Sequence, residues 1–113
     1  MPSIGVIVPL LPGKTDSDRE AMISCWRGDR QPDYERSRKN LGITREAVFI
    51  QTTPGGDFAV VYWEAEDVVA TFQGMATSDD PFDIWFRDHV RDVHGINVED
   101  GFPPPEQVMD FRA

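Results

Sequence analysis

The two histidines, His89 and His94, are the first candidates for chemistry, because an imidazole can take up and release a proton near neutral pH. Both lie in the stretch SDDPFDIWFRDHVRDVHG, residues 78–95. They are five residues apart, so on one helix their side chains would point about 140° from each other and could not chelate one ion together. The chain also lacks H-E-x-x-H and C-x-x-C motifs. We therefore predict no metal site.

His89 is the stronger candidate, because it lies among aromatic residues at helical spacing. The predicted helix would carry on one face Phe82, Trp85, Phe86, His89, Val90 and Val93. Two interpretations are open. Either His89 is a core residue whose imidazole is satisfied by a neighbouring group, or it faces a cavity between helix and sheet and transfers protons there. On the second interpretation His89 is the best catalytic candidate. The predicted ligand-binding residues are then His89, Trp85, Phe86 and Trp26.

The single cysteine, Cys25, lies on the apolar face of a helix predicted to begin at Thr15. We interpret it as a small apolar core residue and not as a nucleophile. One cysteine cannot form an internal disulfide, which favours a reducing compartment. The apolar N-terminus lacks the basic region of a signal peptide, and no run approaches the roughly 20 apolar residues that span a bilayer. The expected location is the cytoplasm, away from membranes.

The bulk composition excludes further classes. The chain has 113 residues, with 20 acidic against 11 basic side chains and a net charge of −9. This length favours one domain, residues 1–113, and the negative charge argues against binding nucleic acid. Gly55 and Gly56 are assigned to a turn, so no glycine-rich phosphate loop remains. We predict no cofactor.

The elements that must position His89 follow from apolar periodicity and from turn and capping residues. The predicted strands are residues 3–11, 46–53, 58–65 and 106–113. The two central strands flank the turn PGGD and form a hairpin. The predicted helices begin at Thr15, at Pro32, near Glu66 and at Pro81, and Gly95 ends the last of them.

With the first two helical pieces taken as one segment, the order is β, α, β, β, α, β. It predicts an α+β, ferredoxin-like fold with a four-stranded antiparallel sheet and helices on one face. The first strand is apolar on both sides, with Ile4, Val6 and Val8 on one and Ile7 on the other. Its second side needs a cover, so we expect a homodimer through the sheet face. Tyr62 and Trp63 alternate, and the sequence leaves open which of them faces the helices.

The segments GITREAVFIQTTPGGDFAVVYWEAED (residues 42–67) and DPFDIWFRDHVRDVHGI (residues 80–96) resemble those of small bacterial members of the dimeric α/β-barrel superfamily. In that superfamily two ferredoxin-like subunits stack sheet on sheet. Members include antibiotic-biosynthesis monooxygenases, muconolactone isomerase, haem-degrading enzymes and stress-induced proteins. The haem-degrading members use an asparagine of the first strand, which the segment IGVIVP does not contain.

The resemblance implies that a small apolar or aromatic molecule binds between sheet and helices. A catalytic version would be a cofactor-independent monooxygenase or isomerase, with His89 as the base and Trp85 and Trp26 as walls of the site. The alternative is a purely structural or interaction module, in which the same aromatic side chains fill the core.

Overall fold

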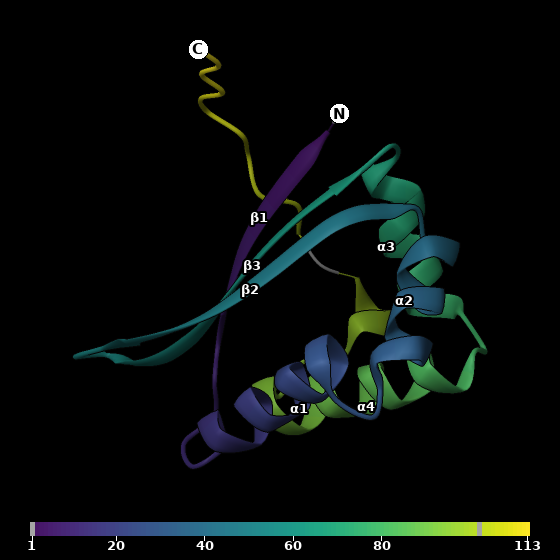
Figure 1. Ribbon diagram of the computed structural model, residues 1–113. Helices are drawn as coiled ribbons and strands as arrows, with labels where there is room; N and C mark the ends of the chain where they lie inside the picture. Colours follow the sequence, from purple (N-terminus) through teal and green to yellow (C-terminus); the bar gives the residue numbers. More distant parts are fainter. Residues whose placement is uncertain (1, 102) are drawn as a thin grey trace.

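The computed structural model describes residues 2–101 and 103–113, and it forms a small α+β fold of one sheet and four helices (Figure 1). The strands are β1 (Ser3–Pro9), β2 (Ile43–Thr53) and β3 (Gly56–Ala65). The helices are α1 (Thr15–Arg27), α2 (Gln31–Asn40), α3 (Val68–Thr77) and α4 (Pro81–His94), and a 3-10 turn, η1, covers Val98–Asp100. Among the described residues, no helix is both long and apolar enough to cross a membrane.

The predicted hairpin is confirmed. Strands β2 and β3 pair antiparallel, with Thr53 opposite Gly56 at the turn. Gly56 has a φ of 124°, a conformation that side-chain-bearing residues rarely adopt. Strand β1 pairs antiparallel with the other edge of β3, which gives the order β1-β3-β2.

Successive side chains along each strand point to opposite sides, so the sheet has two different faces. The inner face packs against the helices, and its core is formed by Ile4, Ile43, Trp63 and Ala65. Trp63 is only 2% exposed, whereas its neighbour Tyr62 lies on the opposite, outer face. Trp63, and not Tyr62, therefore faces the helices, a point that the sequence left open.

The helix termini follow their capping residues. The side chain of Asp80 accepts a hydrogen bond from the Phe82 amide at 2.8 Å, Pro81 is the first residue of α4, and Gly95 ends the helix with a φ of 71°. These were the predicted start and end of the helix. Helix α1 does begin at Thr15, but no side chain caps it there. The Thr15 hydroxyl instead donates to Asp57 at 2.7 Å, which ties α1 to the start of β3.

The predicted ferredoxin-like fold is wrong. The sheet has three strands, not four, and the element order is β, α, α, β, β, α, α rather than β, α, β, β, α, β. A sheet-on-sheet barrel of four-stranded subunits therefore does not describe this chain.

The strand predicted at residues 106–113 is absent from the described structure, where residues 103–113 form neither helix nor strand. Residues 105–107 already lie beside Ser3–Gly5, the first residues of β1. The chain that follows runs past the end of β1 (Figure 1) and has no strand left with which to pair. Three consecutive prolines, residues 103–105, also lack the amide donors that a ladder needs. The apolar side chains that the strand would have buried remain exposed, namely Val108, Met109 and Phe111.

Candidate functional site

A cavity of about 110 Å³ lies between the inner face of the sheet and helices α1, α3 and α4. Most of its wall is apolar. The sheet contributes Val6, Val8, Val48, Ala59, Val61 and Trp63, and the helices contribute Met22, Phe72, Met75, Phe86 and Val90. Four side chains with ionisable groups also reach the wall: Asp18, Glu46, His89 and His94. An apolar cavity with a few polar groups is the usual composition of a small-molecule site.

His89 and Asp18 form a buried pair on this wall. Nε2 of His89 lies 2.8 Å from Oδ1 of Asp18, and the two side chains are only 10% and 3% exposed. Because a carboxylate can only accept, an ionised Asp18 requires the proton on Nε2. The other ring nitrogen, Nδ1, then carries a lone pair, and it makes no hydrogen bond with any described residue. The pair therefore has the polarity of a general base whose imidazole is oriented by a carboxylate.

The aromatic side chains of α4 hold the imidazole in place. The Trp85 ring stacks on His89, with centroids 5.4 Å apart and planes 15° from parallel. The Arg30 guanidinium lies 4.0 Å from the Trp85 centroid, so a cation and an imidazole both pack on this indole. Trp85 thus fixes the orientation of His89, although it does not line the cavity itself.

Glu46 on β2 is the second carboxylate of the wall, and its charge is paired. Its Oε1 accepts from Arg38 Nε at 2.9 Å and from the Tyr34 hydroxyl at 2.6 Å. Burial by itself would lower the pKa of Arg38, but the Glu46 carboxylate and the Tyr34 oxygen together outweigh this and leave it raised. Burial and Glu46 also raise the pKa of the Tyr34 hydroxyl. The Arg38 guanidinium lies 4.6 Å from the centroid of Phe86, another residue of the wall.

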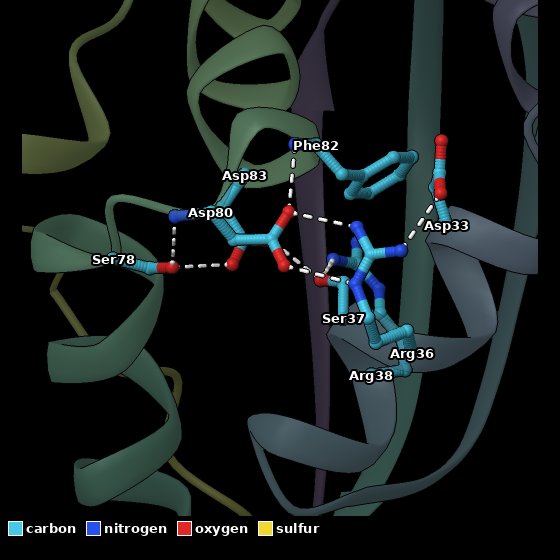
Figure 2. A network of polar contacts seen from close by, with 8 residues as sticks. All are labelled: Asp33, Arg36, Ser37, Arg38, Ser78, Asp80, Phe82 and Asp83. Carbon is cyan, nitrogen blue, oxygen red and sulfur yellow. Dashed lines mark hydrogen bonds and ion pairs between the residues drawn. The ribbon is translucent and has the colours of Figure 1, made fainter.

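A network of polar contacts continues from Arg38 and joins α2 to the start of α4 (Figure 2). Arg38 donates to Ser37 at 3.2 Å, Ser37 donates to Asp83, and the other oxygen of Asp83 accepts from Ser78 at 2.6 Å. Nearer the surface, Arg36 binds both oxygens of Asp80, at 3.0 and 3.1 Å, and these bonds lower the pKa of Asp80. This network positions α4, which carries His89.

The predicted site residues do not all come together. His89 and Phe86 line the cavity, and Trp85 lies directly behind His89. Trp26 is 65% exposed and is not part of the wall. Cys25 is buried and free, and burial raises the pKa of its thiol, which makes it a poor nucleophile. His94 reaches the wall from the last turn of α4, where its Nδ1 donates to the Pro9 carbonyl at 2.8 Å.

Sequence reasoning missed Asp18 and Glu46 as site residues. Asp18 lies in the first turn of the helix predicted to begin at Thr15, where acidic residues are common and raise no suspicion of a site. A signal was present, because Asp18 shares a helical face with Ala21, Met22 and Cys25, and a carboxylate on an apolar face needs a buried partner. The signal for Glu46 was weaker. It is a charged residue at the first inward-facing position of a strand whose following inward-facing residues are apolar.

Across residues 2–101 and 103–113, no group of three or more histidine, cysteine, aspartate or glutamate side chains could hold a metal ion. Comparisons with protein-family models, with curated proteins and with solved structures found no match to this chain. Its function must therefore be argued from the site itself.

Proposed function

We propose that this chain binds a small apolar or aromatic molecule in the cavity between the sheet and helices α1, α3 and α4. The single observation that carries this proposal is an apolar wall interrupted by a buried His89–Asp18 pair. Burying ionisable side chains in an apolar wall costs free energy, so a wall built only for packing would not be expected to contain this pair.

The volume limits the ligand. An enclosed apolar cavity of roughly 150 Å³ can hold a benzene molecule. The cavity here is smaller, about 110 Å³, but it is open to solvent on one side, so part of a bound ring would lie at its mouth. A single ring, or a branched aliphatic group of similar size, is the class that fits. Phe72, Phe86 and Trp63 supply aromatic surface against which such a ring would pack.

Two neighbouring valines of β3 offer a matched test, because they lie on opposite faces of the sheet. Val61 lines the cavity, whereas Val60 lies on the outer face. We expect toluene, titrated by NMR, to bind the wild-type protein and Val60→Phe with equal affinity. Val61→Phe fills the cavity and should weaken binding at least about tenfold. If wild-type protein shows no saturable shifts, or if both variants bind toluene as well as wild type, the proposal fails.

A second candidate function is proton transfer on the bound molecule, and the orientation of His89 by Asp18 favours it. His89 would take a proton from a carbon next to a carbonyl and return it to the same molecule, so that isomerisation needs no oxidant or cofactor. Exchange of the α-protons of cyclohexanone in D₂O, followed by NMR, tests this function. Wild-type protein should accelerate exchange above the buffer rate, and His89→Gln should remove the acceleration. Exchange at the buffer rate with wild-type protein would refute it.

We also propose that two copies associate through the outer face of the sheet. Ile7, Val60 and Phe49 are in register across the three strands there, and Ile7 and Phe49 are 62% and 60% exposed. Arg45 and Glu64 add opposite charges to the same face, which a two-fold arrangement could pair between copies.

Light scattering at about 100 μM protein measures this association. Wild type should have twice the mass of the chain, and Phe49→Glu should be a monomer with unchanged circular dichroism. Val69→Glu, at an exposed position on α3, is the control and should remain a dimer. A monomeric wild type would exclude the proposed interface.

A further inference from the structure

The C-terminal residues 106–113 carry the most exposed large apolar side chains of the described chain. Val108, Met109 and Phe111 are 83%, 79% and 82% exposed, whereas no other large apolar side chain of the described residues exceeds 65%. Single exposed apolar residues are common on protein surfaces, but three within four positions concentrate apolar surface in one segment. Such a concentration marks a contact with a partner.

The path of the chain keeps this segment away from its own core. Residues 105–107 lie beside Ser3–Gly5 at the start of β1, and the chain then runs away from α1 and α4 (Figure 1). The three prolines at residues 103–105 have fixed φ angles and hold the chain extended there. The segment therefore starts at the edge of the sheet, and its own chain does not bury its apolar side chains.

The outer face of the sheet is small for a stable dimer. The central strand, β3, has 10 residues. At about 3.4 Å per residue and about 4.8 Å per strand, the three strands present a projected area of roughly 500 Å². A stable interface buries about 800 Å² on each partner, so two copies that met through this face alone would need a further contact surface. Val108, Met109 and Phe111 supply one, since a single buried aromatic side chain accounts for roughly 150–250 Å².

We propose that, in the dimer, residues 106–113 of each copy cross to the other copy and pack their apolar side chains against the margin of its outer face. This inference rests on the proposed association through that face and names the second contact that completes it. Ile7 and Phe49 lie on the two edge strands, β1 and β2, and are 62% and 60% exposed, so both margins carry apolar side chains. Sheets packed face to face lie about 10 Å apart, and the residues after 107 reach about 20 Å when extended.

Two valines give a matched test of this contact. Val108 and Val69 are 83% and 65% exposed in the single chain, but Val69 lies on α3. Sedimentation velocity over a dilution series measures the dissociation constant of the dimer. A two-fold dimer forms the contact twice, so each substitution removes it twice. We expect Val108→Ser to raise the dissociation constant at least about tenfold, deletion of residues 106–113 to raise it further, and Val69→Ser to leave it unchanged.

Isotope-filtered NMR identifies the contact directly. In a mixture of ¹³C-labelled and unlabelled wild-type protein, the filtered spectrum reports only protons that are close to each other in different copies. The methyl groups of Val108 and Met109 should show such contacts with Ile7 or Phe49. The contact exists only between copies, so its loss shifts association and not the unfolding of one chain.

The outcomes separate this inference from the association on which it rests. A monomeric wild type overturns the association through the outer face, and the inference with it. A wild-type dimer whose dissociation constant is unchanged by Val108→Ser or by the deletion overturns the inference alone. Filtered spectra of the dimer in which residues 106–113 contact only their own chain do the same, and the outer-face association then stands without the C-terminal segment.

Discussion

Removal of the charge of Glu46 should destabilise the protein far more than removal of an exposed charge. Glu46 and Arg38 are 2.9 Å apart, and their side chains are 7% and 6% exposed. Unit charges about 4 Å apart attract by about 4 kcal/mol at the effective dielectric of partly buried sites. Glu46→Gln keeps an acceptor for the Tyr34 hydroxyl but leaves the Arg38 guanidinium buried without a counter-charge. Breaking a buried pair in this way costs about 3–5 kcal/mol.

Urea unfolding, followed by circular dichroism, measures this loss as a change in the free energy of unfolding. The control is Asp92→Asn, because Asp92 pairs with Lys14 at the same distance of 2.9 Å but with side chains 56% and 38% exposed. That variant should lose less than about 1 kcal/mol.

The single variant Arg38→Met and the double variant Arg38→Met, Glu46→Gln complete a double-mutant cycle. The double variant removes both charges, so it should be more stable than the sum of the two single-variant losses predicts, by about 2 kcal/mol. If Glu46→Gln costs no more than Asp92→Asn, or if the two single losses simply add, then the pair does not stabilise the wall of the cavity and the reasoning is wrong.

Four further predictions concern the frame around the site. Asp80→Ala removes the cap of α4 and should cost about 1 kcal/mol in urea unfolding, whereas Asp80→Asn retains a good capping group and should cost less. The hydrogen bonds from Arg36 and from Thr15 hold the pKa values of Asp80 and Asp57 below their ordinary values. The stabilisation that these hydrogen bonds give the folded protein is thus fully present above about pH 4 and is lost as the pH falls through the lowered pKa values of the two carboxyl groups. Tm should therefore fall less steeply on acidification in the double variant Asp80→Asn, Asp57→Asn than in wild type. Gly95→Ala forces a side chain into a φ of 71° and should lower the free energy of unfolding by about 1 kcal/mol, and an unchanged midpoint would contradict the left-handed cap. Deletion of residues 103–113, whose side chains are exposed, should change the free energy of unfolding by less than about 1 kcal/mol, and a larger loss would mean that this segment packs on β1 more than its exposure indicates.

Local chemistry determined those parts of the fold that the sequence predicted correctly. The hairpin of β2 and β3 follows from two alternating strands around Pro54, Gly55 and Gly56, because strand and turn preferences act over a few residues. The start and end of α4 follow from Asp80, Pro81 and Gly95 for the same reason. The helical spacing also placed His89 on the same face as Phe86 and Val90, independently of what covers that face.

Only the tertiary structure decided what that face contacts. Asp18 and His89 are 71 positions apart, and a helical pattern gives no information about the partner across a packed interface. The same limit explains why Trp26 does not line the cavity. The sequence pattern places Trp26 on the same helical face as Cys25, but it does not fix how wide the buried part of that face is, and Trp26 lies at the exposed margin. It also explains the missing fourth strand. Residues 106–113 have an alternating pattern, but a strand forms only where an unpaired edge lies beside it, and the path of the chain past Ser3–Gly5 leaves none.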